Sequence, residues 1–263
     1  MTAPADIRRV GMLTPSSNTV LEPYTQRMFA AFGEAASVHF ARFRVVEISM
    51  SAGSVGQFDQ APILDAAARL AEARVHCIAW NGTSAAWLGL DKDRELARAI
   101  TAATGIPAAT AMLAFDEALQ ALGARRIGLV TPYLSEVQER IVANYAARGF
   151  EVVAEERLED PGNFSFALHT PAAIADQCRR VAKAKPDAIL IVCTNFRGAP
   201  IAAAIEAETG VPVLDSVAVT AWKAMAVAGL DPARVTGWGG AFRLPATASL
   251  TELEPEEHGG STS

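Results

Sequence analysis

Short apolar segments alternate with longer, Ala-rich segments along most of the chain. The Ala-rich segments carry their apolar residues at helical spacing, whereas the apolar segments have the length of strands. The pattern predicts strands at 10–14, 38–45, 75–80, 107–111, 126–131, 151–158, 188–193 and 211–216, and helices at 63–74, 93–104, 115–123 and 135–149. Such alternation is typical of parallel sheets covered by helices, so we expect an α/β fold.

The chain also repeats part of its own sequence. Three short motifs recur in the same order: RRVGMLTP (8–15) as RRIGLVTP (125–132), WNGTS (80–84) as VCTNF (192–196), and TGIP (104–107) as TGVP (209–212). Any two strand–helix units share some likeness, but three ordered echoes favour two halves related by a pseudo-twofold axis. We therefore expect two α/β domains with parallel four-stranded sheets and a site in the cleft between them.

The repeat sets the expected division of the chain. The first half should comprise residues 1–117 together with a returning C-terminal segment, 217–251, and the second half residues 118–216. The remaining residues, 252–263, are polar and rich in Gly and Ser, which predicts a disordered tail.

Composition narrows the class of protein. The chain has 263 residues, of which 51% are hydrophobic and 20% charged, and a net charge of -6. The negative charge argues against nucleic acid or an acidic membrane surface as a partner. The start of the chain lacks the apolar stretch of a signal peptide, and no apolar run is long enough to span a membrane. The three cysteines are odd in number and far apart, which favours a reduced cytoplasmic protein without disulfides.

Signatures of cofactor and metal sites are missing from the sequence. It has no G-x-G-x-x-G after the first strand, no GxxxxGK[ST] and no G-x-S-x-G, and its four histidines lack metal-ligand spacing. We expect no cofactor and no metal. Acid/base chemistry by side chains is therefore the simplest enzymatic interpretation.

Small polar residues cluster where predicted strands end. The clusters are TPSSNT (14–19), NGTS (81–84), TPY (131–133) and CTN (193–195). In open parallel sheets ligands bind beyond the carboxyl ends of the strands, where helix N-termini attract anions by roughly 0.3–1 kcal/mol each. Two facing halves would bring all four clusters together and suit a small carboxylate or dicarboxylate, although some of these residues are expected to be simple helix caps.

These clusters resemble a known group of enzymes. The chain is similar to the aspartate/glutamate racemase superfamily, in particular to its branch of maleate cis-trans isomerases and arylmalonate decarboxylases. The resemblance rests on PSSNT (15–19), GTS (82–84), TPY (131–133), DPGNFSFA (160–167), CTN (193–195) and VAVTAWKAMAVAG (217–229). It implies two facing α/β domains, no cofactor, and carbanion chemistry at a carbon next to a carboxylate.

One departure from the superfamily pattern bears on the reaction. Racemases and maleate isomerases of this superfamily use two cysteines, one per half; the second corresponds to Cys193, whereas the first falls at Gly82. Cys77 and Cys178 are expected to be core residues. Arylmalonate decarboxylases likewise carry a glycine and a single cysteine, while PSSNT and the segment around Asn163 are more similar to the isomerases. Decarboxylation and isomerisation therefore stay nearly equal, ahead of racemisation and of a non-catalytic small-acid binding protein.

The resemblance and the residue chemistry together assign expected roles. Cys193 is the expected proton donor or acceptor, with its pKa lowered toward neutrality by a helix N-terminus. The expected substrate-binding residues are Ser17, Asn18, Gly82, Thr83, Ser84, Tyr133, Asn163, Thr194 and Asn195. Among them Thr83, Ser84 and Tyr133 would hydrogen-bond an enediolate, and Asn18 and Asn163 a carboxylate. Trp80 and Trp87 are expected mainly in core packing, and a homo-oligomer is left open.

Overall fold

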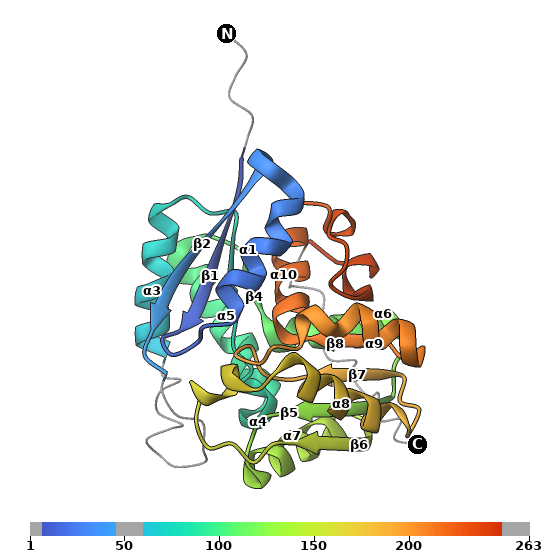
Figure 1. The fold of residues 1–263 in the computed structure, drawn as a ribbon. Coiled ribbons are helices and arrows are strands. Elements are labelled where there is room, and N and C mark those ends of the chain that lie inside the picture. The colour runs from blue at the N-terminus through green and yellow to red at the C-terminus, as the bar shows by residue number, and fades with distance from the viewer. Residues whose placement is uncertain (1–6, 46–59, 249–263) are drawn as a thin grey trace, which may run out of the picture.

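The computed structural model describes residues 7–45 and 60–248, and its strands form two parallel sheets of four strands each (Figure 1). The strands are β1 (Arg8–Pro15), β2 (Ala36–Phe43), β3 (Cys77–Trp80), β4 (Ala108–Thr110), β5 (Arg126–Thr131), β6 (Glu151–Arg157), β7 (Ala188–Ile191) and β8 (Val213–Asp215). The sheet orders are β2-β1-β3-β4 and β6-β5-β7-β8. Both sheets thus have the same strand order, and the predicted α/β fold is confirmed.

Helices follow most of the strands. They are α1 (Leu21–Phe29), α3 (Gln60–Glu72), α4 (Ala85–Leu88), α5 (Leu90–Thr104), α6 (Ala111–Leu122), α7 (Ser135–Ala147), α8 (Pro171–Ala182), α9 (Ala202–Thr209) and α10 (Ser216–Val227). Short 3₁₀ helices lie at Ala30–Ala35 (η1), Ser165–Leu168 (η2), Ala199–Ile201 (η3), Pro232–Arg234 (η4) and Gly240–Arg243 (η5). Helix α6 begins four residues before the predicted start at 115, because Oγ1 of Thr110 accepts a hydrogen bond from the N–H of Leu113 and caps the helix there.

The sequence echoes occupy equivalent places in the two halves. Helices α5 and α9 both end in a left-handed glycine, Gly105 at φ 69° and Gly210 at φ 71°. In each case the preceding threonine, Thr104 or Thr209, donates its hydroxyl to the carbonyl four residues earlier at 2.7 Å. The T-G pair is a helix-ending device that both halves use just before their last strand.

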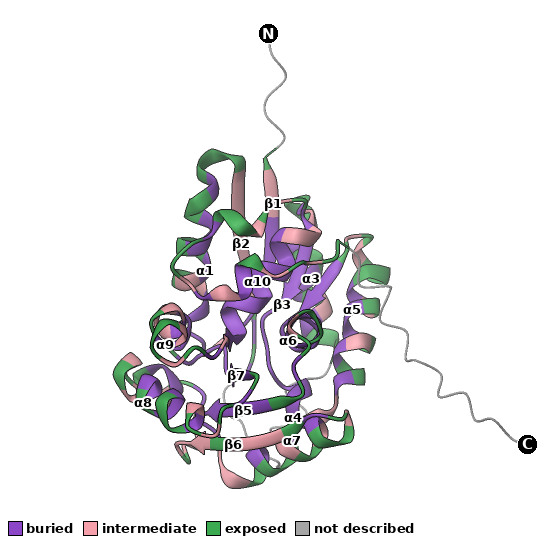
Figure 2. Ribbon diagram, turned by 90° about the vertical axis from the view of Figure 1, so that its right-hand side faces the viewer, coloured by how far each residue is buried: buried purple, intermediate pink, exposed green. Residues whose placement is uncertain are grey.

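Burial differs between the two edges of each sheet. The outer edge strands β2 and β6 are mostly of intermediate burial (Figure 2). The opposite edge strands β4 and β8 are completely buried. The helices that follow these buried strands, α6 and α10, pack against each other, and α10 also contacts β3 and β4. The two halves therefore join along β4, β8 and their following helices.

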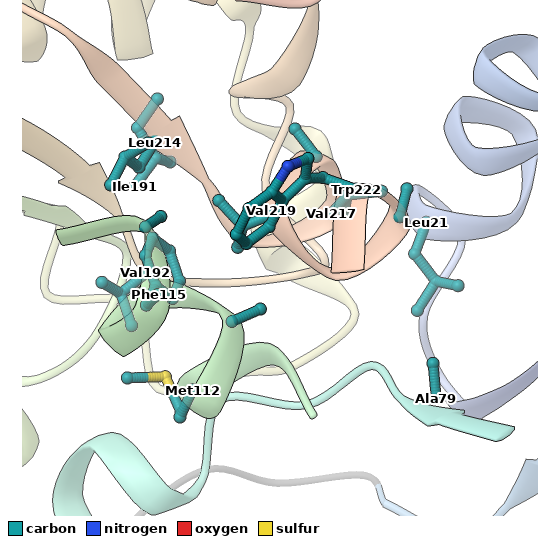
Figure 3. Packing of buried hydrophobic residues seen from close by; sticks show 14 of the residues in the cluster. Leu21, Ala79, Met112, Phe115, Ile191, Val192, Leu214, Val217, Val219 and Trp222 are labelled. Atoms are coloured by element: carbon teal, nitrogen blue, oxygen red, sulfur yellow. The ribbon is translucent and has the colours of Figure 1, made fainter. Parts of the chain in front are cut away.

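A continuous apolar core links the two halves. Figure 3 shows side chains from α6, β7, β8 and α10 packed together, among them Phe115, Ile191 and Trp222. The indole N–H of Trp222 in α10 donates to the carbonyl of Leu244 at 3.2 Å, so the segment that follows α10 stays against this core.

The proposed domain boundaries at 117/118 and 216/217 stay predictions, and the predicted tail, 252–263, lies outside the described residues.

Candidate active site

The strand-end clusters of the two halves are hydrogen-bonded to each other. Asn18, which follows β1, donates from Nδ2 to Oγ1 of Thr194 at 3.1 Å. The hydroxyl of Thr194 donates in turn to the carbonyl of Asn81, which follows β3, at 3.2 Å. Oδ1 of Asn195 accepts the N–H of Thr19 at 2.9 Å. Asn18, Thr194 and Asn195 are each at most 4% exposed, so these buried contacts hold the carboxyl ends of the two sheets together.

The segment between β6 and α8 adds Asn163 to this group. Nδ2 of Asn163 donates to Oγ of Ser17 at 2.8 Å, and Ser17 donates to the carbonyl of Val45 at 2.7 Å. The carbonyl of Asn163 accepts Nδ2 of Asn195 at 2.6 Å. Asn163 therefore bridges the two halves, with one contact to each, rather than merely shaping a turn.

Cys193 lies just beyond β7 and is held by its backbone. Its N–H donates to Oγ of Ser216 at 2.9 Å, and that hydroxyl donates to the carbonyl of Ile191 at 2.7 Å. The Cys193 side chain is 3% exposed, and its thiol is hydrogen-bonded by the hydroxyl of Tyr133. The same hydroxyl lies 2.8 Å from Oγ1 of Thr83, in the first half. A thiol and two hydroxyl groups thus form one connected group across the two halves.

The electrostatic environment keeps the Cys193 thiol protonated. Burial raises its pKa to about 12, although the hydrogen bonds from Tyr133 and from the N–H of Asn195 favour the thiolate. The expectation that a helix N-terminus lowers this pKa toward neutrality is wrong. The chain leaves β7 in an irregular segment and becomes helical only at Ala199, so the helix that follows this strand does not begin at Cys193. Desolvation therefore dominates.

Position, rather than burial, distinguishes Cys193 from the other cysteines. Cys77 and Cys178 are free and buried, and burial raises the pKa of each to about 12 as well. Cys77 lies within β3 and Cys178 within α8, as expected for core residues. Of the three, Cys193 alone lies at a strand end with Tyr133 hydrogen-bonded to its sulfur.

Two aromatic rings pack edge-on against the ring of Tyr133. The Tyr133 ring meets Trp87 edge-on with centroids 5.3 Å apart, and it meets Phe166 in the same manner at 5.5 Å. Trp87, expected in core packing, thus packs on a candidate site residue. Because Tyr133 is 2% exposed, these contacts fix the direction in which its hydroxyl points.

Gly82 lies in close contact with Trp80. A Cβ atom at Gly82 would be 1.9 Å from Cζ2 of Trp80 and 2.4 Å from both Cε2 and Cη2. Ser84, the remaining candidate of this segment, is buried and directly precedes α4 without capping it. All ten sequence candidates are therefore placed at or next to the carboxyl ends of the two sheets or in the segment that carries Asn163.

Two residues of this region were missed by the sequence analysis. Ser216 binds the backbone of Cys193, and the carbonyl of Asn81 binds Thr194. Ser216 directly follows β8, so the rule that selected small polar residues at strand ends would also have found it. Asn81 acts through its backbone, which no side-chain pattern reveals.

Known proteins are similar to this chain over most of its length. Residues 34–242 match the arylmalonate decarboxylase family. A maleate isomerase of Pseudomonas putida KT2440 is 27% identical over 85% of this chain and 93% of its own length. An arylmalonate decarboxylase of Bordetella bronchiseptica is 31% identical over 68% of this chain and 76% of its own. The crystal structure of a maleate isomerase from Pseudomonas putida S16 with maleate superposes with a TM-score of 0.81, at 26% identity, over 90% of this chain and 97% of that one.

The part of the chain that the structure describes shows neither a metal-binding cluster nor a membrane-spanning helix. Within residues 7–45 and 60–248, no three or more His, Cys, Asp or Glu side chains are grouped so that they would hold a metal ion. In the same part of the chain no helix has the length and apolar character needed to cross a membrane.

Proposed function

Because the chain belongs to the arylmalonate decarboxylase family, we propose that it is a cofactor-independent enzyme that decarboxylates a small malonate-type diacid, with Cys193 as proton donor. Relatives named for maleate and for arylmalonate support a small carboxylate as substrate. The choice between decarboxylation and isomerisation rests on the state of the thiol.

The burial of the Cys193 thiol against the hydroxyl of Tyr133 is the observation that carries this proposal. With its pKa raised to about 12 by burial, the thiol holds its proton at neutral pH. In the decarboxylation the bond between the α-carbon and one carboxylate breaks, CO2 leaves, and the electron pair stays on the substrate as an enediolate. The S–H proton of Cys193 then passes to the α-carbon, and water returns a proton to the thiolate. The reaction begins without a thiolate, as this site requires.

Neighbouring donors suit the developing negative charge. The hydroxyl of Tyr133 contacts both the sulfur and the hydroxyl of Thr83. These two hydroxyls supply hydrogen bonds to enediolate oxygens, and the buried Ser84 lies next to Thr83. Donors on Asn18 and Asn163, with Ser17, Thr194 and Asn195 around them, suit the carboxylate that remains. Since Cys193 is 3% exposed, a substrate reaches the sulfur only if side chains at the junction of the two halves move apart.

Isomerisation of a maleate-type acid is the second candidate. It is favoured by the similarity to the maleate isomerase over 93% of that protein's length and by the bridging position of Asn163. Addition of sulfur to a double bond needs a thiolate, however, and burial opposes a thiolate at Cys193.

Racemisation needs a second acid/base group on the opposite face, which Gly82 does not supply. A non-catalytic binding protein would use the same carboxylate donors without the thiol.

The experiment is incubation in D2O with a panel of malonates, maleate and amino acids, followed by NMR. We expect a malonate to lose CO2 and its product to gain one deuterium. Cys193→Ser should lower kcat by about 10²–10⁴-fold with binding retained, whereas the matched variant Cys178→Ser should keep its turnover. Conversion of maleate to fumarate without malonate turnover would instead establish an isomerase. If the wild type binds these acids and turns none of them over, the protein is a binding protein.

The cytoplasmic location and a homo-oligomer stay predictions.

A further inference from the structure

The contact between Trp80 and Gly82 is not explained by backbone conformation. The φ angle of Gly82 is not positive, so its backbone does not need a glycine. What excludes a side chain is the indole of Trp80, whose six-membered ring lies where the Cβ would be. Atoms at 1.9–2.4 Å overlap far inside van der Waals contact, so glycine is required at 82 as long as Trp80 keeps its position.

The indole has little room to retreat. Trp80 is the last residue of β3, an interior strand, and pairs with Leu13 of β1 on one side and Thr110 of β4 on the other. Its side chain is 1% exposed, and its ring packs against Phe43 with centroids 5.1 Å apart and planes tilted by 46°. A rigid bicyclic ring in such packing moves only as a whole, so it does not yield as the tip of a flexible side chain would.

Both chain neighbours of Gly82 are connected to the residues around Cys193. Its neighbour Thr83 connects to Cys193 through Tyr133, and the carbonyl of its other neighbour, Asn81, binds the hydroxyl of Thr194, next to Cys193. Position 82 thus lies in the first half between two residues that are connected by hydrogen bonds to the group around Cys193.

We infer that Trp80 is a specificity-determining residue that limits this site to proton transfer from one face, by filling the space that any side chain at position 82 would need. This inference rests on the proposed function. It restricts the substrates to acids whose reaction ends with a single proton delivery by Cys193, and it excludes racemisation of the product. A second thiol at 82 requires that Trp80 be replaced at the same time.

Stability measurements test the steric part without reference to activity. Gly82→Cys should lower the Tm by about 5 °C or more in the wild-type background, as overpacking does. In a Trp80→Leu background the same substitution should lower the Tm by about 2 °C or less, because the ring is gone. Trp222→Leu is the matched control: it removes a fully buried indole from α10, and there Gly82→Cys should keep its full effect.

Equal Tm losses in the Trp80→Leu and wild-type backgrounds would overturn the inference. If Gly82→Cys fails to fold alone but folds together with Trp80→Leu, the inference is supported. If neither folds, Gly82→Ala, which adds only the Cβ, provides the same comparison.

Stereochemistry tests the catalytic part. In D2O the wild type should leave the enantiopure product unracemised. Trp80→Leu/Gly82→Cys should racemise it with uptake of deuterium, because the introduced thiol and that of Cys193 would transfer protons on opposite faces. Racemisation by the wild type, or a Trp80→Leu/Gly82→Cys variant that decarboxylates but does not racemise the product, contradicts the one-face role of Trp80. If the wild type converts no malonate, the proposed function fails, while the Tm comparison still decides the steric claim.

Discussion

The hydroxyl of Tyr133 lies 2.8 Å from Oγ1 of Thr83 and is also hydrogen-bonded to the thiol of Cys193. One phenol thus connects the candidate acid to a hydroxyl of the opposite half. Burial raises the pKa of Tyr133 well above its usual value, so the phenol stays a neutral donor across the physiological range. Its position lets it stabilise a charge on either neighbour.

Removing this hydroxyl should impair catalysis far more than folding. We expect Tyr133→Phe to lower kcat by about 10²–10³-fold, the usual loss for one donor of an oxyanion site. Tyr145→Phe is the matched control, because Tyr145 is equally buried and its hydroxyl has no hydrogen-bond partner among the described residues. Steady-state kinetics and thermal unfolding of both variants check this. A kcat for Tyr133→Phe within twofold of the wild type would remove Tyr133 from the proposed mechanism.

The pKa of Cys193 predicts the alkaline side of the pH profile. A donor must be protonated, and burial raises the pKa of this thiol to about 12, so rising pH should not deplete the active form until pH approaches that value. We expect kcat to show no alkaline decline between pH 7 and about 10. The measurement is kcat against pH, with Tm recorded at each point to separate unfolding. A decline centred near the ordinary thiol pKa of about 8.5 would show that the bound site lowers the pKa.

Asp93 should make stability depend on pH in the neutral range. Burial raises its pKa from 3.8 to about 7, although the hydroxyl of Thr110 and the N–H of Met112 bind the carboxyl, and Oδ2 has no partner among the described residues. Because the folded-state pKa lies above the unfolded one, the protonated group favours folding fully below about pH 4. This contribution, on the order of 4 kcal/mol, is lost as pH rises through about 7.

The test of this linkage is Asp93→Asn. An amide keeps a carbonyl oxygen for Thr110 and Met112 but carries no charge, so the variant should gain Tm relative to the wild type between pH 5 and pH 8. Asp91→Asn, in the same turn of α5 but largely exposed, should show a pH-independent difference within about 0.5 kcal/mol of zero. A Tm difference for Asp93→Asn that is constant with pH would contradict the buried-acid interpretation.

A buried ion pair should couple α6 to α10. Nζ of Lys223 lies 2.5 Å from Oε2 of Glu117, and the two side chains are 1% and 11% exposed. Lys223→Met leaves a buried carboxylate without its cation, so we expect a loss of about 3–5 kcal/mol, or a Tm lower by roughly 6–20 °C. Lys223→Met/Glu117→Leu should recover much of that loss.

The exposed pair of Arg69 and Asp65 supplies the control for this prediction. The two side chains are 62% and 63% exposed, so Arg69→Ala should change stability by at most about 0.5 kcal/mol. If the stability losses of Lys223→Met and Glu117→Leu simply add up in the double variant, the pair does not couple the helices.

Much of the fold was predictable because it depends on local patterns. All eight strands lie within or overlap their predicted ranges, since apolar runs between helical segments have few other solutions. The T-G echo was recognised only as part of the repeat, and the structure adds that its left-handed glycine ends a helix in each half. The start of α6 was missed, because the cap at Thr110 cannot be told from a strand residue without the hydrogen bond it makes.

The site was predictable only in part. The strands of a parallel sheet have their carboxyl ends at the same edge, so small polar residues that follow these strands come close together. The residues around Cys193 could be predicted for this reason. The pKa of Cys193 was expected in the wrong direction, because strand-end position suggested a helix N-terminus that the chain does not form there. The clash between Trp80 and Gly82 was not foreseeable, since it depends on the orientation of one indole against Phe43.

By itself, the sequence determined the alternation of strands and helices, the repeat, and hence two parallel sheets with polar residues at their carboxyl ends. Local hydrophobic periodicity and helix-ending residues are sufficient for these features. Tertiary structure alone decided that Asn18 meets Thr194 across 176 residues of chain, that Cys193 keeps its proton, and that Trp80 fills the space beside Gly82. Desolvation and steric exclusion are set by every atom packed around a group, and most of those atoms come from distant parts of the chain.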